Sequence, residues 1–172
     1  MFFVNFLYLF VKMEEQTMRE ISLNAKIEIY NWDELPDNYK LLAEEAKKSC
    51  SKAYAPYSGF RVGAAVLLDS GRIVTGNNQE NGAYTTGMCA ERTAINYAAS
   101  QFPDDCPAII AIAAYHCNAL TAMPCTPCGE CRQVMKEMEK RWGKKIRIVM
   151  VGAQEVWVCN GINTLLPLAF EL

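Results

Sequence analysis

Four cysteines stand where their thiols could bind one metal ion. Cys125, Cys128 and Cys131 follow at equal intervals in "MPCTPCGECRQ", and Cys89 lies further back in "CAER". C-x-x-C is a common zinc half-site, and the free backbone N–H groups at a helix N-terminus stabilise a thiolate. Cys128 and Cys131 are three apart in an expected first helical turn, so their sulfurs can share one face. If Cys89 also begins a helix, two helix N-termini aim three thiolates at one point.

Glu91 would give such a centre a proton carrier. Residues two apart do not share a face within a helix, but a cap residue is not yet helical, so Glu91 could still approach a zinc-bound water. Three protein ligands leave a fourth position for that water, and a carboxylate beside it can accept its proton. Three thiolates weaken zinc's power to acidify water, and Arg92 could draw charge off the sulfurs. Taken alone, Glu91 could equally cap a helix and Arg92 could be a surface residue.

Cys125 decides whether the centre is open or closed. With Cys125 as a fourth ligand the site would be a structural zinc module without turnover. An iron–sulfur cluster also uses C-x-x-C-x-x-C, but it usually requires a nearby fourth cysteine, and Cys106 lies upstream. We expect Cys125, on the other side of Pro127 from the helix-starting pair, to be a buried small side chain or a neighbour of the ligands. His116, the only histidine, is expected to be structural.

The composition is that of an ordinary globular protein. The 172 residues are 51% hydrophobic and 21% charged, enough for one compact domain with a real core. The formal net charge is -2, so the basic footprint of a nucleic-acid-binding protein is absent. A small neutral ligand is the better expectation.

The N-terminus indicates where the protein resides. "MFFVNFLYLFV" is apolar, but it is far shorter than the roughly 20 residues that span a bilayer. It has no basic residue before Lys12, whereas a signal peptide begins with a positively charged region. We expect the natural start at Met13 or Met18, a cytoplasmic protein with reduced thiols, and no membrane partner. Residues 1–18 then form an extension outside the core, and residues 19–172 form one domain.

Hydrophobic periodicity and turn signals predict alternating strands and helices. Strict alternation in "ISLNAKIEI" predicts a half-buried strand, and a continuous apolar run predicts a central strand over 108–116. Strands alternating with helices indicate a mixed sheet with helices on its faces. The expected strands are 21–29, 60–69, 72–78, 108–116, 145–151 and 155–159, and the expected helices are 36–53, 91–102 and 129–142.

Two motifs in this order resemble the cytidine deaminase family, in its small three-cysteine form that acts on free nucleosides. They are "CAERTA" and "PCGECRQV", and the likeness runs from about Tyr54 to Phe170, through "YAPYSGFRVGAA", "GNNQENGAY" and "LLPLAF". The resemblance implies a three-layer α/β/α fold with a mixed, roughly five-stranded sheet. The strand over 21–29 would be an extra N-terminal strand outside the resemblance.

The resemblance also implies a role for each site residue. From the residues alone, the polar members could form a strand-end turn and the two phenylalanines could be plain core. The implied roles are one Zn2+ per chain on Cys89, Cys128 and Cys131, catalysis by Glu91, support of the thiolates by Arg92, ribose binding by Asn78 and Glu80, pyrimidine packing by Phe60, a backbone contact from Ala90 to the base, and a reach into a neighbouring subunit's site by Phe170.

The implied reaction is hydrolytic deamination of cytidine and deoxycytidine to uridine and deoxyuridine in pyrimidine salvage. Glu91 would take a proton from the zinc-activated water and pass it to N3, hydroxide would attack C4, and ammonia would leave. The family implies a homotetramer with shared active sites, a small nucleoside as substrate, and no polynucleotide partner.

Two related activities and one departure from the family remain to be weighed. A blasticidin-type aminonucleoside deaminase shares the zinc motifs but lacks the glutamate that corresponds to Glu80. A polynucleotide-editing deaminase usually has His in place of Cys89. The segment "YHCNALTAM" is longer than expected for the family and could lie over the site.

Overall fold

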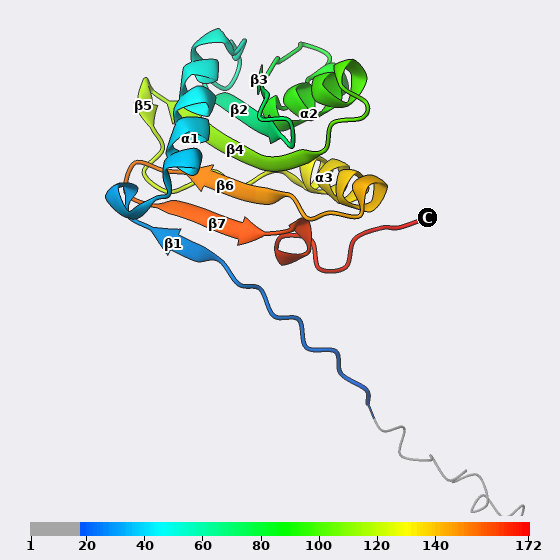
Figure 1. Ribbon diagram of the computed structural model, residues 1–172. Helices are drawn as coiled ribbons and strands as arrows, with labels where there is room; N and C mark the ends of the chain where they lie inside the picture. The colour runs from blue at the N-terminus through cyan, green and yellow to red at the C-terminus, as the bar shows by residue number, and fades with distance from the viewer. Residues whose placement is uncertain (1–17) are drawn as a thin grey trace, which may run out of the picture.

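A seven-stranded sheet forms the centre of the molecule (Figure 1), in a computed structural model that describes residues 18–172. The strand order is β1-β7-β6-β4-β2-β3, and the short β5 pairs with β4. Only β4 and β6 run parallel, so the sheet is mixed. The strands are β1 (Glu28–Tyr30), β2 (Arg61–Leu68), β3 (Ile73–Asn77), β4 (Pro107–His116), β5 (Ala119–Leu120), β6 (Arg147–Val151) and β7 (Val156–Asn160).

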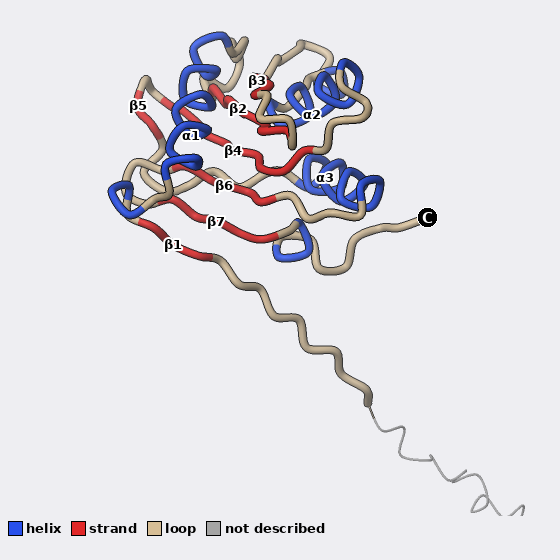
Figure 2. Tube along the Cα trace, viewed as in Figure 1, coloured by secondary structure: helices blue, strands red, loops and turns tan. Residues whose placement is uncertain are grey.

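Helices cover both faces of the sheet, which confirms the expected three-layer α/β/α arrangement (Figures 1 and 2). α1 (Asp37–Ser49) packs on one face, and α2 (Ala90–Gln101) and α3 (Gly129–Trp142) pack on the other. The central strand β4 is apolar throughout because both of its faces are covered. Ile110 and Ile112 face α2 and α3, whereas Ala111 and Ala113 face α1.

Local signals in the sequence set the ends of the helices. Pro36 is the N-cap of α1, which gives way to a 3-10 turn after Ser49, so the helix is shorter than the expected 36–53. Gly143 ends α3 in the left-handed conformation, with φ of 62°. Gly76 lets α2 approach β3 closely, since a Cβ there would lie 2.6 Å from the carbonyl oxygen of Ala90.

The expected N-terminal strand over 21–29 is wrong in its extent. Only Glu28–Tyr30 is a strand, and Ile21 and Leu23 are exposed. The alternating pattern is present, but in the register that places Glu28 opposite Val158, residues before 26 would lie past the end of β7 at Asn160 and have no partner in that strand. The expectations for residues 1–17 lie outside the described residues. Between residues 18 and 172, no helix is long and apolar enough to cross a membrane.

The long segment "YHCNALTAM" forms a short β-hairpin instead of lying over the site. β5 pairs back on the end of β4, with His116 opposite Ala119. The two turn residues, Cys117 and Asn118, have φ values of 51° and 62°, as a two-residue hairpin turn requires. None of the residues from 115 to 123 lines the large cavity described below.

Candidate metal centre and cavity

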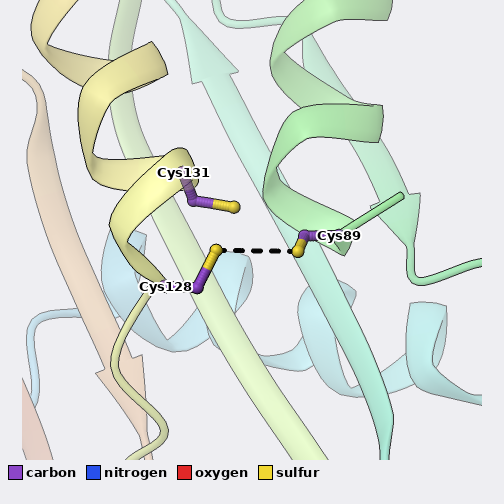
Figure 3. A group of neighbouring side chains, drawn as sticks. All are labelled: Cys89, Cys128 and Cys131. Atoms are coloured by element: carbon purple, nitrogen blue, oxygen red, sulfur yellow. Dashed lines mark hydrogen bonds between the residues drawn. The ribbon is translucent and has the colours of Figure 1, made fainter. Parts of the chain in front are cut away.

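Three sulfurs meet where α2 and α3 begin (Figure 3). Cys89 is the N-cap of α2, Cys128 is the N-cap of α3, and Cys131 lies in the first turn of α3. Both caps have extended backbone, which turns their thiols across the helix starts. All three Sγ atoms lie within 4.8 Å of one another, and those of Cys89 and Cys128 are 3.7 Å apart. The structure therefore brings together the three thiols that the sequence singled out.

The donor set fits zinc. Tetrahedral zinc with Zn–S bonds of about 2.3 Å places its sulfurs roughly 3.8 Å apart, close to the separation of Cys89 and Cys128. A hydrogen bond from Cys131, together with the positive charge of Arg92, lowers the pKa of Cys89 to about 5. The pKa of Cys131 is raised, mainly through the same hydrogen bond. The cluster thus already holds negative charge, as a cation-binding site of thiolates must.

Cys125 lies apart from the three sulfurs. It lines the neighbouring cavity, is partly buried, and is not a member of the metal-binding group. Burial raises the pKa of its thiol to about 11, which keeps it protonated. This placement agrees with the expectation that Cys125 is a neighbour of the ligands.

Glu91 lies in the first turn of α2 and is only 5% exposed. Burial raises the pKa of its carboxyl, and the negative charge of Cys89 adds to the effect. The carboxyl also interacts with the Cys131 thiol and lines the cavity. A buried carboxyl beside a thiolate centre is well placed to take up and release protons.

Arg92 connects the two helix starts. Its Nη2 lies 3.1 Å from Oε2 of Glu130 and donates to the carbonyl of Gly87 at 3.3 Å. Its Nε is buried and has no hydrogen-bond partner among the described residues. The guanidinium thus lies beside the thiols, and its Nε donates to no oxygen of the described residues.

A cavity of about 710 Å³ opens directly in front of the metal centre. This volume is within the usual range for a small-molecule site, about 300–1,000 Å³. It is lined by the two cap cysteines, Cys89 and Cys128, and by Glu91 and Arg92. Its wall also contains most of the other residues assigned from the resemblance: Phe60, Asn78, Glu80 and Ala90.

Asn78 and Glu80 hold the cavity wall in shape with their own side chains. Asn78 accepts from the backbone N–H of Val62 at 2.8 Å and donates to the carbonyl of Phe60 at 2.9 Å. Glu80 accepts from the Tyr57 N–H at 2.9 Å and from the Ser58 hydroxyl, and these bonds lower its pKa. Oε2 of Glu80 also accepts from the Ser58 N–H, but Oε1 accepts only from the Ser58 hydroxyl and keeps a further lone pair. The Asn78 amide keeps its second N–H, so both side chains have free hydrogen-bonding capacity.

Phe170 lies away from this chain's own cavity. Its side chain is 68% exposed, and it is not among the residues that line the cavity. The C-terminal segment runs along α3, where Gln133 Nε2 donates to the Phe170 carbonyl and Lys136 pairs with Glu171 at 2.7 Å. The segment is therefore attached to the body while the phenyl ring faces outward.

The sequence did not reveal three positioning side chains. Arg132 donates to the carbonyls of Pro127 and Leu165 and so fastens the loop before α3. Ser58 binds Glu80 and also accepts from the N–H of Phe60. Glu130 pairs with Arg92. A serine two residues before Phe60 signals a turn, but nothing local in the sequence indicates the two longer-range contacts.

Comparison with known proteins gives a consistent result. The sequence profile described as the cytidine and deoxycytidylate deaminase zinc-binding region matches residues 36–146. The cytidine deaminase of Halalkalibacterium halodurans is 43% identical over 99 residues, which cover 58% of this chain and 70% of that protein. The cytidine deaminase of Sporosarcina psychrophila is 46% identical over 101 residues, covering 59% and 69%.

Solved structures agree with the sequence comparison. The cytidine deaminase from Burkholderia pseudomallei has a TM-score of 0.66 and 39% identity, covering 76% of this chain and 98% of that one. The cytidine deaminase from Mycobacterium tuberculosis has a TM-score of 0.62 and 31% identity, covering 80% and 100%. The profile match includes both helix starts that carry the three thiols. The chain belongs to the family of zinc-binding cytidine and deoxycytidylate deaminases.

Proposed function

We propose that the protein hydrolytically deaminates cytidine and deoxycytidine to uridine and deoxyuridine, releasing ammonia. The observation that carries the proposal is one cavity lined by the buried Glu91 carboxyl and by two members, Cys89 and Cys128, of the cluster of three thiols. Cys89, Cys128 and Cys131 would hold one zinc ion, which when bound supplies a Lewis acid that makes water acidic near neutral pH. This arrangement suits the attack of water on an electron-poor ring carbon.

Glu91 moves the protons. In its ionised form it takes a proton from the attacking water and delivers it to N3 of the cytosine ring, which makes C4 more electrophilic. It then takes the second proton of that water from the new hydroxyl on C4 and gives it to the amino group, so that C4 becomes a carbonyl and the leaving group is ammonia. Its raised pKa suits both directions of transfer, because the acid and the base form are then closer in energy at neutral pH.

The rest of the cavity fits a nucleoside. Asn78 and Glu80 bind the ribose hydroxyls with the hydrogen-bonding capacity that their structural contacts leave free. Phe60 packs on the pyrimidine. The backbone of Ala90 at the start of α2 donates to the base carbonyl, because the first N–H groups of a helix have no intrahelical acceptor.

The charges favour a free nucleoside over a nucleotide. Among the described residues that line the cavity, Arg92 is the only cation, and it is paired with Glu130. The other charged residues of the wall are Glu80, Glu91 and Glu130 itself. A 5′-phosphate would therefore meet carboxylates without a free cation.

The assembly we propose is a homotetramer with shared active sites. Phe170 supports this, because Gln133 of α3 binds its backbone carbonyl while its ring is exposed outside this chain's own cavity. In the assembly the ring would reach the cavity of a neighbouring subunit. Burying an exposed aromatic ring in this way also contributes to association.

We propose a cytoplasmic role in pyrimidine salvage. All eight cysteines lie in the described part of the chain and none forms a disulfide. Free thiols persist in a reducing compartment. The products, uridine and deoxyuridine, are substrates that a salvage route would phosphorylate.

One assay tests the proposal. Ammonia release is measured with cytidine, deoxycytidine and cytidine 5′-monophosphate, and zinc content is determined on the same sample. We expect one zinc per chain, turnover of both nucleosides and little turnover of the nucleotide. Zinc-loaded protein without nucleoside turnover would refute the activity, and preferred turnover of the nucleotide would refute the substrate class.

A further inference from the structure

One ion pair joins the two helix starts that carry the thiols. Arg92 lies in the first turn of α2 and Glu130 in the first turn of α3, and their Nη2 and Oε2 atoms are 3.1 Å apart. Within residues 18–172 it is the only salt bridge between these helices. Glu130 stands between Cys128 and Cys131 in the sequence, so the two flanking thiols fix its place in the turn.

Arg92 is held by contacts of Nη2, and its Nε is a buried donor. Nη2 contacts Glu130 and the carbonyl of Gly87, whereas Nε is buried and finds no hydrogen-bond partner within residues 18–172. A buried donor without a partner is costly. The guanidinium also interacts with the Cys89 thiol, which holds the Arg92 pKa above and the Cys89 pKa below its ordinary value, and outer hydrogen bonds to metal ligands commonly orient them.

We propose that Glu130 is a positioning residue that holds the Arg92 guanidinium against the thiolates of the metal centre. The inference rests on the proposed zinc-dependent deamination. In this role Glu130, which lines the cavity, is not a metal ligand. It acts through Arg92, fixing both the arginine and the distance between the two helix starts.

The exposure of the pair determines which measurement will show this role. The side chain of Glu130 is 72% exposed and that of Arg92 is 22% exposed. An exposed ion pair contributes little to folding. Its loss should therefore appear in metal retention and turnover, with little change in the melting temperature.

Glu130→Gln tests the inference, because glutamine keeps the size and removes the charge. The matched control is Glu137→Gln, an exposed glutamate on the same helix. We expect zinc release to a chelator to accelerate roughly two- to fivefold and kcat to fall by a similar factor, as suits an exposed pair. KM for cytidine should change by less than about twofold, and the difference in zinc release should shrink in about 0.5 M salt.

A double-mutant cycle shows whether the effect passes through Arg92. In an Arg92→Gln background, the added Glu130→Gln change should leave the rate of zinc release unaltered. Zinc release from Glu130→Gln at the wild-type rate would overturn the inference, and so would an equal loss in the Arg92→Gln background. Failure of the deaminase proposal is distinguishable, since wild-type protein would then retain zinc without releasing ammonia.

Discussion

Among single residues, Glu91 separates metal binding from turnover. Its carboxyl lines the cavity beside the thiols but is not one of the three grouped ligands. In Glu91→Gln the amide keeps the shape but cannot exchange protons, so we expect kcat to fall by about 10²-fold or more. Zinc content should remain at one per chain, as measured by metal analysis of the same preparation. Near-normal ammonia release from this variant would contradict the assigned role.

The two cysteines on either side of Pro127 should respond differently to the same change. Cys128 belongs to the sulfur cluster, whereas Cys125 lies outside it. We expect Cys125→Ser to retain one zinc per chain and most of the activity, because no ligand is lost. Cys128→Ser is the matched comparison and should lose most of its zinc. Loss of the metal from Cys125→Ser would show instead that Cys125 is a fourth ligand and that the centre is closed.

Among the elements, the contact of α2 with β3 sets the position of Cys89 and Glu91. Thr93 Oγ1 donates to the Asn77 carbonyl, and Gly76 leaves room for the helix backbone. In Gly76→Ala the new Cβ would lie 2.5 Å from the Ala94 nitrogen, so α2 must move outward.

Thermal unfolding and turnover report that displacement. We expect Gly76→Ala to destabilise the fold by about 1–3 kcal/mol, the usual cost of overpacking, and to lower kcat. Gly82→Ala is the control, because its Cβ would meet only the Tyr57 hydroxyl at 3.3 Å, the far end of a flexible side chain. Equal behaviour of the two variants would show that the α2–β3 contact does not set the geometry of the site.

The elements also show which features a sequence can reveal. The starts of α2 and α3 were predictable, because cysteine spacing, Pro127 and the apolar periods are local signals. The extent of β1 was not, since it depends on where its distant partner β7 ends. The Arg92–Glu130 pair was not predictable for the same reason: the two residues are far apart in sequence, and only packing brings the two helix starts together.

At the scale of the whole molecule, two of the groups of exposed apolar side chains bear on assembly. Tyr57, Tyr84 and Met88 surround the cavity, and Leu168, Phe170 and Leu172 lie in the C-terminal segment. Clusters of exposed apolar side chains mark contact surfaces more often than isolated ones do. If copies associate with each C-terminal segment against a neighbour's cavity, the two groups cover each other.

Mixing two inactive variants tests that arrangement. Phe170→Ala keeps Glu91 but lacks the ring that serves the neighbour, and Glu91→Gln keeps the ring but lacks the proton carrier. If each site combines Glu91 of one subunit with Phe170 of another, about a quarter of the sites in a randomly mixed assembly contain both intact residues. We therefore expect ammonia release to rise well above the sum of the separate variants after co-refolding or co-expression. Strictly additive activity in a verified mixed oligomer would place Phe170 outside the shared site, because complementation requires residues of two chains at one cavity.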